Sequence, residues 1–135
     1  MRLLGYVACC LALGVASSAC SASSGKTAGN IVAMTTARRY EPATVTIKKG
    51  GTVTFSNDSE EPHSVTAYEG RIPADTRYFS TGDFSTEEQA RDNVAETLVQ
   101  NGDTFEITLT KPGVYEYFCI PHESQGMKGE IVVES

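Results

Sequence analysis

The chain of 135 residues has no tryptophan and only two histidines, and its formal net charge is −6. It lacks a surplus of lysine and arginine, with 11 such residues against 17 aspartates and glutamates. Nucleic-acid binding needs a basic patch, so the sequence does not predict a nucleic-acid partner. Apolar runs of membrane-spanning length are also missing after the first 20 residues. This length predicts one folded domain with its own hydrophobic core.

The first 19 residues predict a secretory signal peptide. Met1-Arg2 supplies positive charge, and Leu3 to Ala16 is apolar apart from two glycines. The apolar run of about 14 residues is short for a membrane-spanning helix but typical of a signal peptide. We therefore divide the chain into a signal peptide (1–19), a Ser/Gly-rich tether (20–30) and a folded domain (31–135).

Cys20 lies at the predicted cleavage point and leaves two interpretations open. A small residue before Cys20 and a polar run after it resemble a bacterial or archaeal lipoprotein signal, in which Cys20 carries the lipid anchor. A cut after Ala19 or Ala22 without lipidation also fits, because Ser17 and Ala19 form a small-x-small site. Both interpretations predict an exported protein, either periplasmic or held at the outer face of the cell membrane.

Of the four cysteines, only one belongs to the folded domain, and it has no structural role that the sequence explains. Cys9 and Cys10 lie in the signal peptide, and Cys20 is either acylated or removed. Cys119 is therefore alone in the folded domain, in an oxidising compartment where single thiols are uncommon. Since no partner is available for a disulfide, we expect a chemical function for Cys119.

Alternating apolar and polar residues predict an all-β domain. The segment 43–49 alternates with period two, which is typical of a half-buried strand, and Gly50-Gly51 then predicts a turn. Seven or eight such strands predict a Greek-key β-sandwich. The predicted strand segments are 30–36, 43–49, 52–55, 63–68, 104–110, 114–119 and 129–133.

Residues 69–100 interrupt this pattern and form an insertion. Ser85 followed by Glu88 has the spacing of a capping box, which predicts a short helix from Ser85 to about Glu96. The sequence assigns no role to the insertion.

The segment 117–127 contains the pattern Cys-x2-His-x4-Met, formed by Cys119, His122 and Met127. His63 begins another predicted strand and can reach the same end of a sandwich. Two imidazoles, one thiolate and a weakly bound thioether form the ligand set of blue-copper electron-transfer sites. The sequence therefore predicts one copper ion.

Other functions account for these residues less well. Structural zinc sites use several cysteines and seldom methionine, and a cysteine protease needs a histidine that activates the nucleophile. An oxidase with a second copper centre needs more histidines than this chain has. An exported copper-storage protein without electron transfer remains the alternative, although Met34 is the only other methionine after the signal peptide, where we expect it to pack in a strand.

Several segments resemble the plastocyanin, amicyanin, pseudoazurin and halocyanin group of cupredoxins. The resemblance covers residues 31–135 and is carried by the motifs at 40–47, 50–57, 61–65 and 112–119, while residues 78–92 are most similar to halocyanins, many of which are lipid-anchored. It implies an eight-stranded Greek-key sandwich and a monomeric electron carrier that meets redox proteins transiently. The ligand pattern of the group falls on His63, Cys119, His122 and Met127.

Two neighbours of the predicted ligands differ from this group. Phe118 stands where plastocyanins have a tyrosine, and Ser64 stands where asparagine is common. We expect Phe118 to offer a second electron route beside the exposed edge of His122. Pro121 has no N–H to donate, so it should influence the reduction potential. We also expect acidic residues to attract a basic partner, namely Asp58, Glu60, Glu61 and Glu123.

Overall fold

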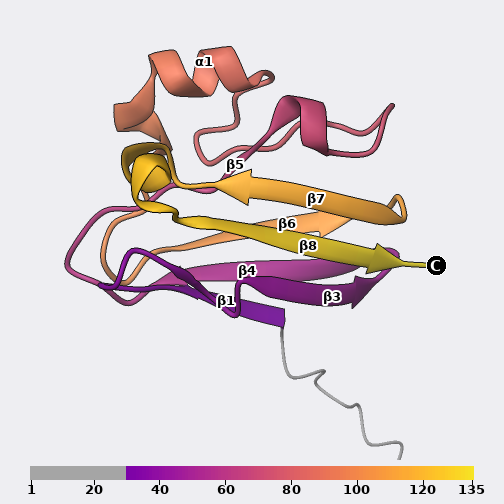
Figure 1. The fold of residues 1–135 in the computed structure, drawn as a ribbon, viewed down its shortest axis with the longest axis horizontal. Coiled ribbons are helices and arrows are strands. Elements are labelled where there is room, and N and C mark those ends of the chain that lie inside the picture. The colour runs from indigo at the N-terminus through magenta and orange to yellow at the C-terminus, as the bar shows by residue number, and fades with distance from the viewer. Residues whose placement is uncertain (1–29) are drawn as a thin grey trace, which may run out of the picture.

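The computed structural model describes residues 30–135, which form two facing four-stranded sheets (Figure 1). The strand order is β2-β1-β4-β6 in one sheet and β3-β8-β7-β5 in the other. The predicted eight-stranded β-sandwich is therefore confirmed. The strands are β1 (Asn30–Met34), β2 (Tyr40–Glu41), β3 (Thr44–Lys48), β4 (Gly51–Asn57), β5 (Thr66–Ala67), β6 (Thr104–Leu109), β7 (Gly113–Phe118) and β8 (Lys128–Glu134).

The predicted signal peptide, Cys20 and all but the last residue of the tether lie outside the described residues. Within residues 30–135, none of the helices combines the length and the apolar character that crossing a membrane requires.

The core lies between the sheets and follows the alternation in the sequence. In β3 the side chains of Val45 and Ile47 point inward while their neighbours are exposed. Successive side chains of a strand point to opposite faces, so each strand contributes every second residue. Met34 is fully buried in β1, as expected from strand packing. The inward residues of the other strands include Val32, Val53, Phe55, Tyr115, Tyr117, Ile131 and Val133.

The predicted strand at 63–68 is shorter in the structure, where only β5 remains. His63 forms an isolated bridge with Val99 instead of belonging to a sheet. The reason is that the next two backbone N–H groups bond to side chains: Ser64 donates to the Cys119 sulfur and Val65 to the Thr81 hydroxyl. The chain therefore leaves the sheet before β5, which frees His63 to face the end of the sandwich.

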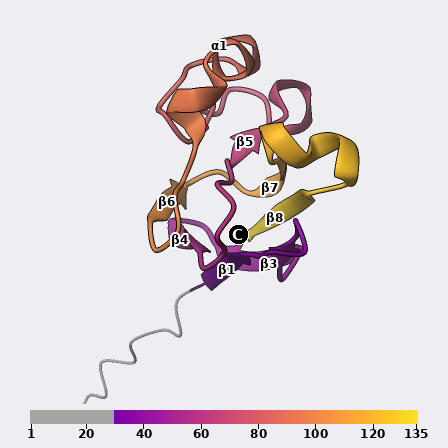
Figure 2. The same ribbon diagram turned by 90° about the vertical axis from the view of Figure 1, so that its left-hand side faces the viewer.

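The predicted bounds of the helix were wrong. The helix α1 spans Glu87–Asp92, and its N-cap is Thr86, whose hydroxyl accepts the N–H of Gln89. The Gln89 side chain accepts the N–H of Ser85, so Ser85 precedes the cap. After a break, a 3-10 turn, η2 (Val94–Thr97), completes the segment. Two further 3-10 turns are η1 (Glu69–Arg71) and η3 (Ile120–Gln125), and Figure 2 shows α1 above β5 and η3 beside β8.

Candidate metal centre

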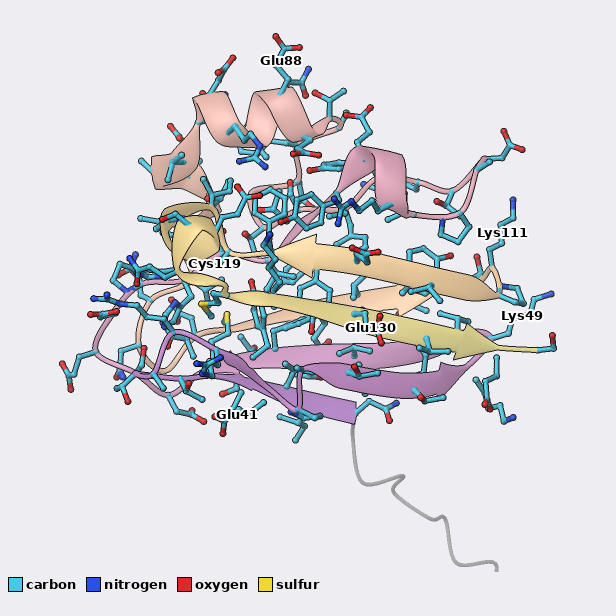
Figure 3. The ribbon with its side chains drawn as sticks, viewed as in Figure 1. Glu41, Lys49, Glu88, Lys111, Cys119 and Glu130 are labelled. Atoms are coloured by element: carbon cyan, nitrogen blue, oxygen red, sulfur yellow. The ribbon has the colours of Figure 1, made fainter. Side chains whose placement is uncertain are left out.

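The loop after β7 brings three predicted ligands together. Cys119 follows the strand, at the end of the sandwich opposite Lys49 and Lys111 (Figure 3). The Cys119 N–H donates to the Met127 carbonyl at 3.1 Å, and the Met127 N–H donates to the His122 carbonyl at 3.2 Å. Gly126 closes the turn with φ of 84°, a left-handed conformation that glycine adopts without a steric cost. These bonds hold Cys119, His122 and Met127 on one compact loop.

His63 completes the group from the other side. Its Nδ1 lies 3.1 Å from Nδ1 of His122 and 3.8 Å from the Cys119 sulfur, which is 3.4 Å from Nδ1 of His122. Bonds of about 2.0–2.3 Å to imidazole nitrogen and thiolate sulfur, as at zinc, need donor–donor separations of roughly 3.5 Å in a trigonal plane. The three donor atoms therefore form a triangle of the size that suits one metal ion.

Met127 lies beside this triangle through its backbone bonds to Cys119 and His122, and its side chain is fully buried. The structure thus brings all four predicted ligands to one end of the sandwich. Two imidazoles, a thiol and a thioether are soft and intermediate donors, and this set fits copper in both oxidation states.

Ser59 and Asn57 fix the orientation of the His63 ring. The Ser59 hydroxyl lies 3.0 Å from Nε2 of His63 and donates to the Asn57 side-chain oxygen or the Glu61 carbonyl, each at 2.9 Å. Because the hydroxyl has one hydrogen, its oxygen accepts the Nε2–H of His63, and Nδ1 is left as the electron-pair donor. The sequence indicated only a polar loop here, since nothing in its pattern pointed to a contact with His63.

Ser64, which the sequence placed next to the site, contacts the cysteine directly. Its N–H donates to the Cys119 sulfur at 3.3 Å, and its hydroxyl accepts the N–H of Ile120 at 2.8 Å. Tyr40 donates its hydroxyl to the Ser64 carbonyl at 2.5 Å. Ser64 therefore ties the two ligand-bearing loops together and supplies a hydrogen bond to the sulfur.

His122 lies at the rim of the site and is 9% exposed. Its Nε2 is 3.6 Å from the Glu61 carboxylate. Arg38 donates two hydrogen bonds to that carboxylate, at 2.7 and 2.8 Å, and a third to the Gln125 side chain. The hydrogen bond from Arg38 lowers the pKa of Glu61 below its usual value. Arg38, which the sequence analysis missed, thus connects the loops on both sides of His122.

The other two residues predicted to act near the site lie in contrasting positions. Pro121 is exposed at the start of η3. Phe118 is fully buried, and the electron route predicted to pass through it stays a prediction. Its ring is covered by Tyr68 and by Arg91 of the insertion, so Phe118 itself does not meet solvent.

Burial sets the protonation of the donors in the absence of a metal. It lowers the pKa of His63 and of His122, and it raises the pKa of the Cys119 thiol. At neutral pH the imidazoles are therefore neutral and able to donate their electron pairs, while the thiol keeps its proton. A metal ion that binds the thiolate must release this proton, so binding strengthens as the pH rises.

The comparisons with known proteins agree with this geometry. The profile of "Copper binding proteins, plastocyanin/azurin family" matches residues 27–134. The chain belongs to the plastocyanin/azurin family of copper-binding proteins. Chloroplastic plastocyanin of Oryza sativa subsp. indica is 36% identical over 94 residues, covering 70% of this chain and 54% of the relative. Plastocyanin A/B of Petroselinum crispum is 32% identical over 94 residues, covering 70% of this chain and 86% of the relative.

The match spans about half the length of the first of these plastocyanins. Among solved structures, an amicyanin variant in its Cu(I) form superposes with a TM-score of 0.58 and 24% identity, covering 78% of this chain and 82% of the amicyanin. This likeness shows that the fold is that of a cupredoxin. The predicted copper cofactor is confirmed, since the family binds copper and the chain carries a fitting donor set.

Proposed function

We propose that His63, Cys119 and His122 would hold one copper ion, that the Met127 thioether would be a weaker fourth ligand, and that the protein carries single electrons. The observation that supports this proposal is the convergence of two Nδ1 atoms and one sulfur within 4.8 Å of one another. When bound, copper supplies a one-electron couple between Cu(I) and Cu(II).

The residues around the donors limit their movement when the charge of the site changes. Ser59 holds the ring of His63, Ser64 holds the Cys119 sulfur, and the bonds across the loop hold Met127. Donors that stay in place in both oxidation states keep the reorganisation on electron transfer small. This property favours an electron carrier over a storage protein, which has no need for it.

The rim of His122 is the proposed contact for a transient redox partner. Of the acidic residues predicted to attract a basic partner, Glu61 is paired with Arg38, and Glu123 is paired with Arg91. Carboxylates that are paired with an arginine of the same chain attract a basic partner only weakly. Asp58 and Glu60 therefore remain as the residues that attract it. We place the protein outside the cytoplasm, in the periplasm or anchored to the membrane through Cys20, and we propose that it acts as a monomer.

A copper titration followed by visible absorption tests this function. An electron carrier gains an intense visible band at one equivalent of Cu(II), and the band disappears with a reductant and returns with an oxidant. The Cys119→Ser variant should lose the band, because the sulfur ligand is removed. A colourless complex that binds only Cu(I) would contradict the proposal and support storage. Intact mass of the membrane fraction decides whether Cys20 carries lipid.

A further inference from the structure

Phe118, the residue before Cys119, is buried by Tyr68 and by Arg91 of the insertion rather than by the core of the sandwich. Its exposed fraction is 0%, yet it does not belong to the main hydrophobic cluster. The adjacent Tyr117 points into that cluster, so Phe118 points to the outer face of the sheet. There the ring of Tyr68 stacks on it, with centroids 4.3 Å apart and planes at 28°, and the Arg91 guanidinium lies 4.3 Å from its centroid.

Tyr68 and Arg91 are held in place by one carboxylate. The Tyr68 hydroxyl donates to Glu123 at 2.8 Å, and Arg91 donates to the other oxygen of Glu123 at 2.7 Å. Arg91 also bonds to Glu87 at the start of α1. Since Glu123 belongs to the same loop as His122, the insertion is fastened directly to the copper-site loop.

Tyr68 is partly exposed, unlike Phe118 beneath it. The side chain of Arg71 lies 4.9 Å from the centre of its ring, and that of Lys128 lies 5.6 Å away. A continuous packed series therefore runs from Cys119, through the backbone and ring of Phe118, to the ring of Tyr68 at the surface.

We propose that Tyr68 is the surface end of a second electron path, which runs from Cys119 through Phe118 to Tyr68. This inference rests on the proposed function. Electron tunnelling falls less steeply through bonds and packed rings than through gaps, and the stack leaves no gap along this line. One electron leaves the reduced site and reduces a one-electron acceptor protein docked over Tyr68, without a change in any bond or in the protonation of Tyr68.

This path also gives the insertion a role. Arg91 lies within the insertion and Tyr68 directly precedes it. Together they prevent a partner from touching Phe118, so the exit of the path lies at Tyr68 and not at Phe118.

Electron transfer within a labelled protein tests the path. A ruthenium polypyridyl complex is attached to Gly70→His in η1, where an added Cβ meets no atom within 4 Å. A control label is attached to Glu60→His, on the exposed loop before His63. After a laser flash, oxidised ruthenium takes one electron from the reduced copper site, and the rate is measured with and without substitutions of Tyr68.

We expect Tyr68→Leu to slow transfer to the label at position 70 severalfold and to leave transfer to the label at position 60 unchanged. Tyr68→Phe, which keeps the stacked ring, should retain the rate at both labels. Should Tyr68→Leu fail to fold, Tyr68→Met removes the ring with less loss of volume and gives the same comparison. The visible spectrum and the reduction potential show that the copper site is intact in each variant.

An unchanged rate at position 70 in Tyr68→Leu would overturn the path. Equal slowing at both labels would overturn it as well, because the change would then lie at the copper site. By contrast, an unsubstituted protein that gains no visible band with copper would contradict the proposed function and not the path alone.

Discussion

The two histidines of the site lie in opposite environments. His63 is fully buried, and its second nitrogen meets the Ser59 hydroxyl within a loop organised by Asn57. His122 is 9% exposed, and its second nitrogen faces the Glu61 carboxylate at the rim. One imidazole is thus enclosed by the protein, and the other is the edge of the site that a partner can approach.

This difference separates two requirements of an electron carrier. An enclosed ligand keeps the donor geometry constant, because Ser59 holds the second ring nitrogen of His63 and the side chain is fully buried. A ligand at the rim shortens the distance that an electron crosses between the copper site and a docked partner. The following substitutions test whether the two histidines are as different as their surroundings indicate.

The largest effect is expected from removing each imidazole in turn. Both His63→Gly and His122→Gly should lose the visible band of the copper protein. Added imidazole should restore the band in His122→Gly, because His122 reaches solvent at the rim, and should fail in His63→Gly, because His63 is fully buried. A visible titration with imidazole measures both outcomes, and equal recovery in the two variants would contradict the comparison.

Ser59→Ala should weaken copper binding without removing it. The variant leaves the Nε2–H of the buried His63 without its acceptor, and loss of such an outer partner lowers metal affinity by about 10–100-fold. Competition with a copper chelator measures the change. Ser56→Ala is the matched control, since its hydroxyl bonds to Asp58 at the surface and does not contact His63. If both variants bind alike, Ser59 does not orient the ligand.

Pro121→Ala should raise the reduction potential moderately. The substitution adds an N–H to the first turn of η3, next to Cys119. An N–H donor near the sulfur stabilises the reduced state more than the oxidised state, because the sulfur holds more negative charge in the reduced state. If the hydrogen bond stabilised the reduced state by about 1.4 kcal/mol more than the oxidised state, the potential would rise by about 59 mV for one electron. We expect a shift smaller than this. Cyclic voltammetry measures it, and an unchanged or lower potential would contradict this account of the loop.

The smallest effect is expected from the exposed acids of the loop before His63. Replacing Asp58 by Asn and Glu60 by Gln should slow reduction of a cationic one-electron oxidant at low salt by no more than severalfold. The difference should fade in 0.15 M salt, where charges are screened over about 8 Å. Stopped-flow rates over a salt series measure both effects. A greater loss from Glu123→Gln would show that its pairing with Arg91 leaves its attraction intact.

The fold and the ligand loop could be predicted because their signals are local. Alternation over five to seven residues predicted strands such as 43–49, and the tight spacing of Cys119, His122 and Met127 predicted a single site. The prediction of the helix failed at its start because Ser85 and Thr86 are both good N-caps, and in the structure the Thr86 hydroxyl accepts the N–H of Gln89. The burial of Phe118 could not be predicted, because it depends on Tyr68 and Arg91, which lie far from it in the sequence.

The sequence by itself determined the donors, their order and the strands that carry them, since alternation and turn residues act over a few positions. Only the tertiary structure decided what surrounds the donors. It brought Arg38 to Gln125 across 87 positions and set Ser59 against His63 and Arg91 against Phe118. Such contacts depend on how sheets and loops pack, because side chains that lack a local pattern find their partners only when the chain has folded.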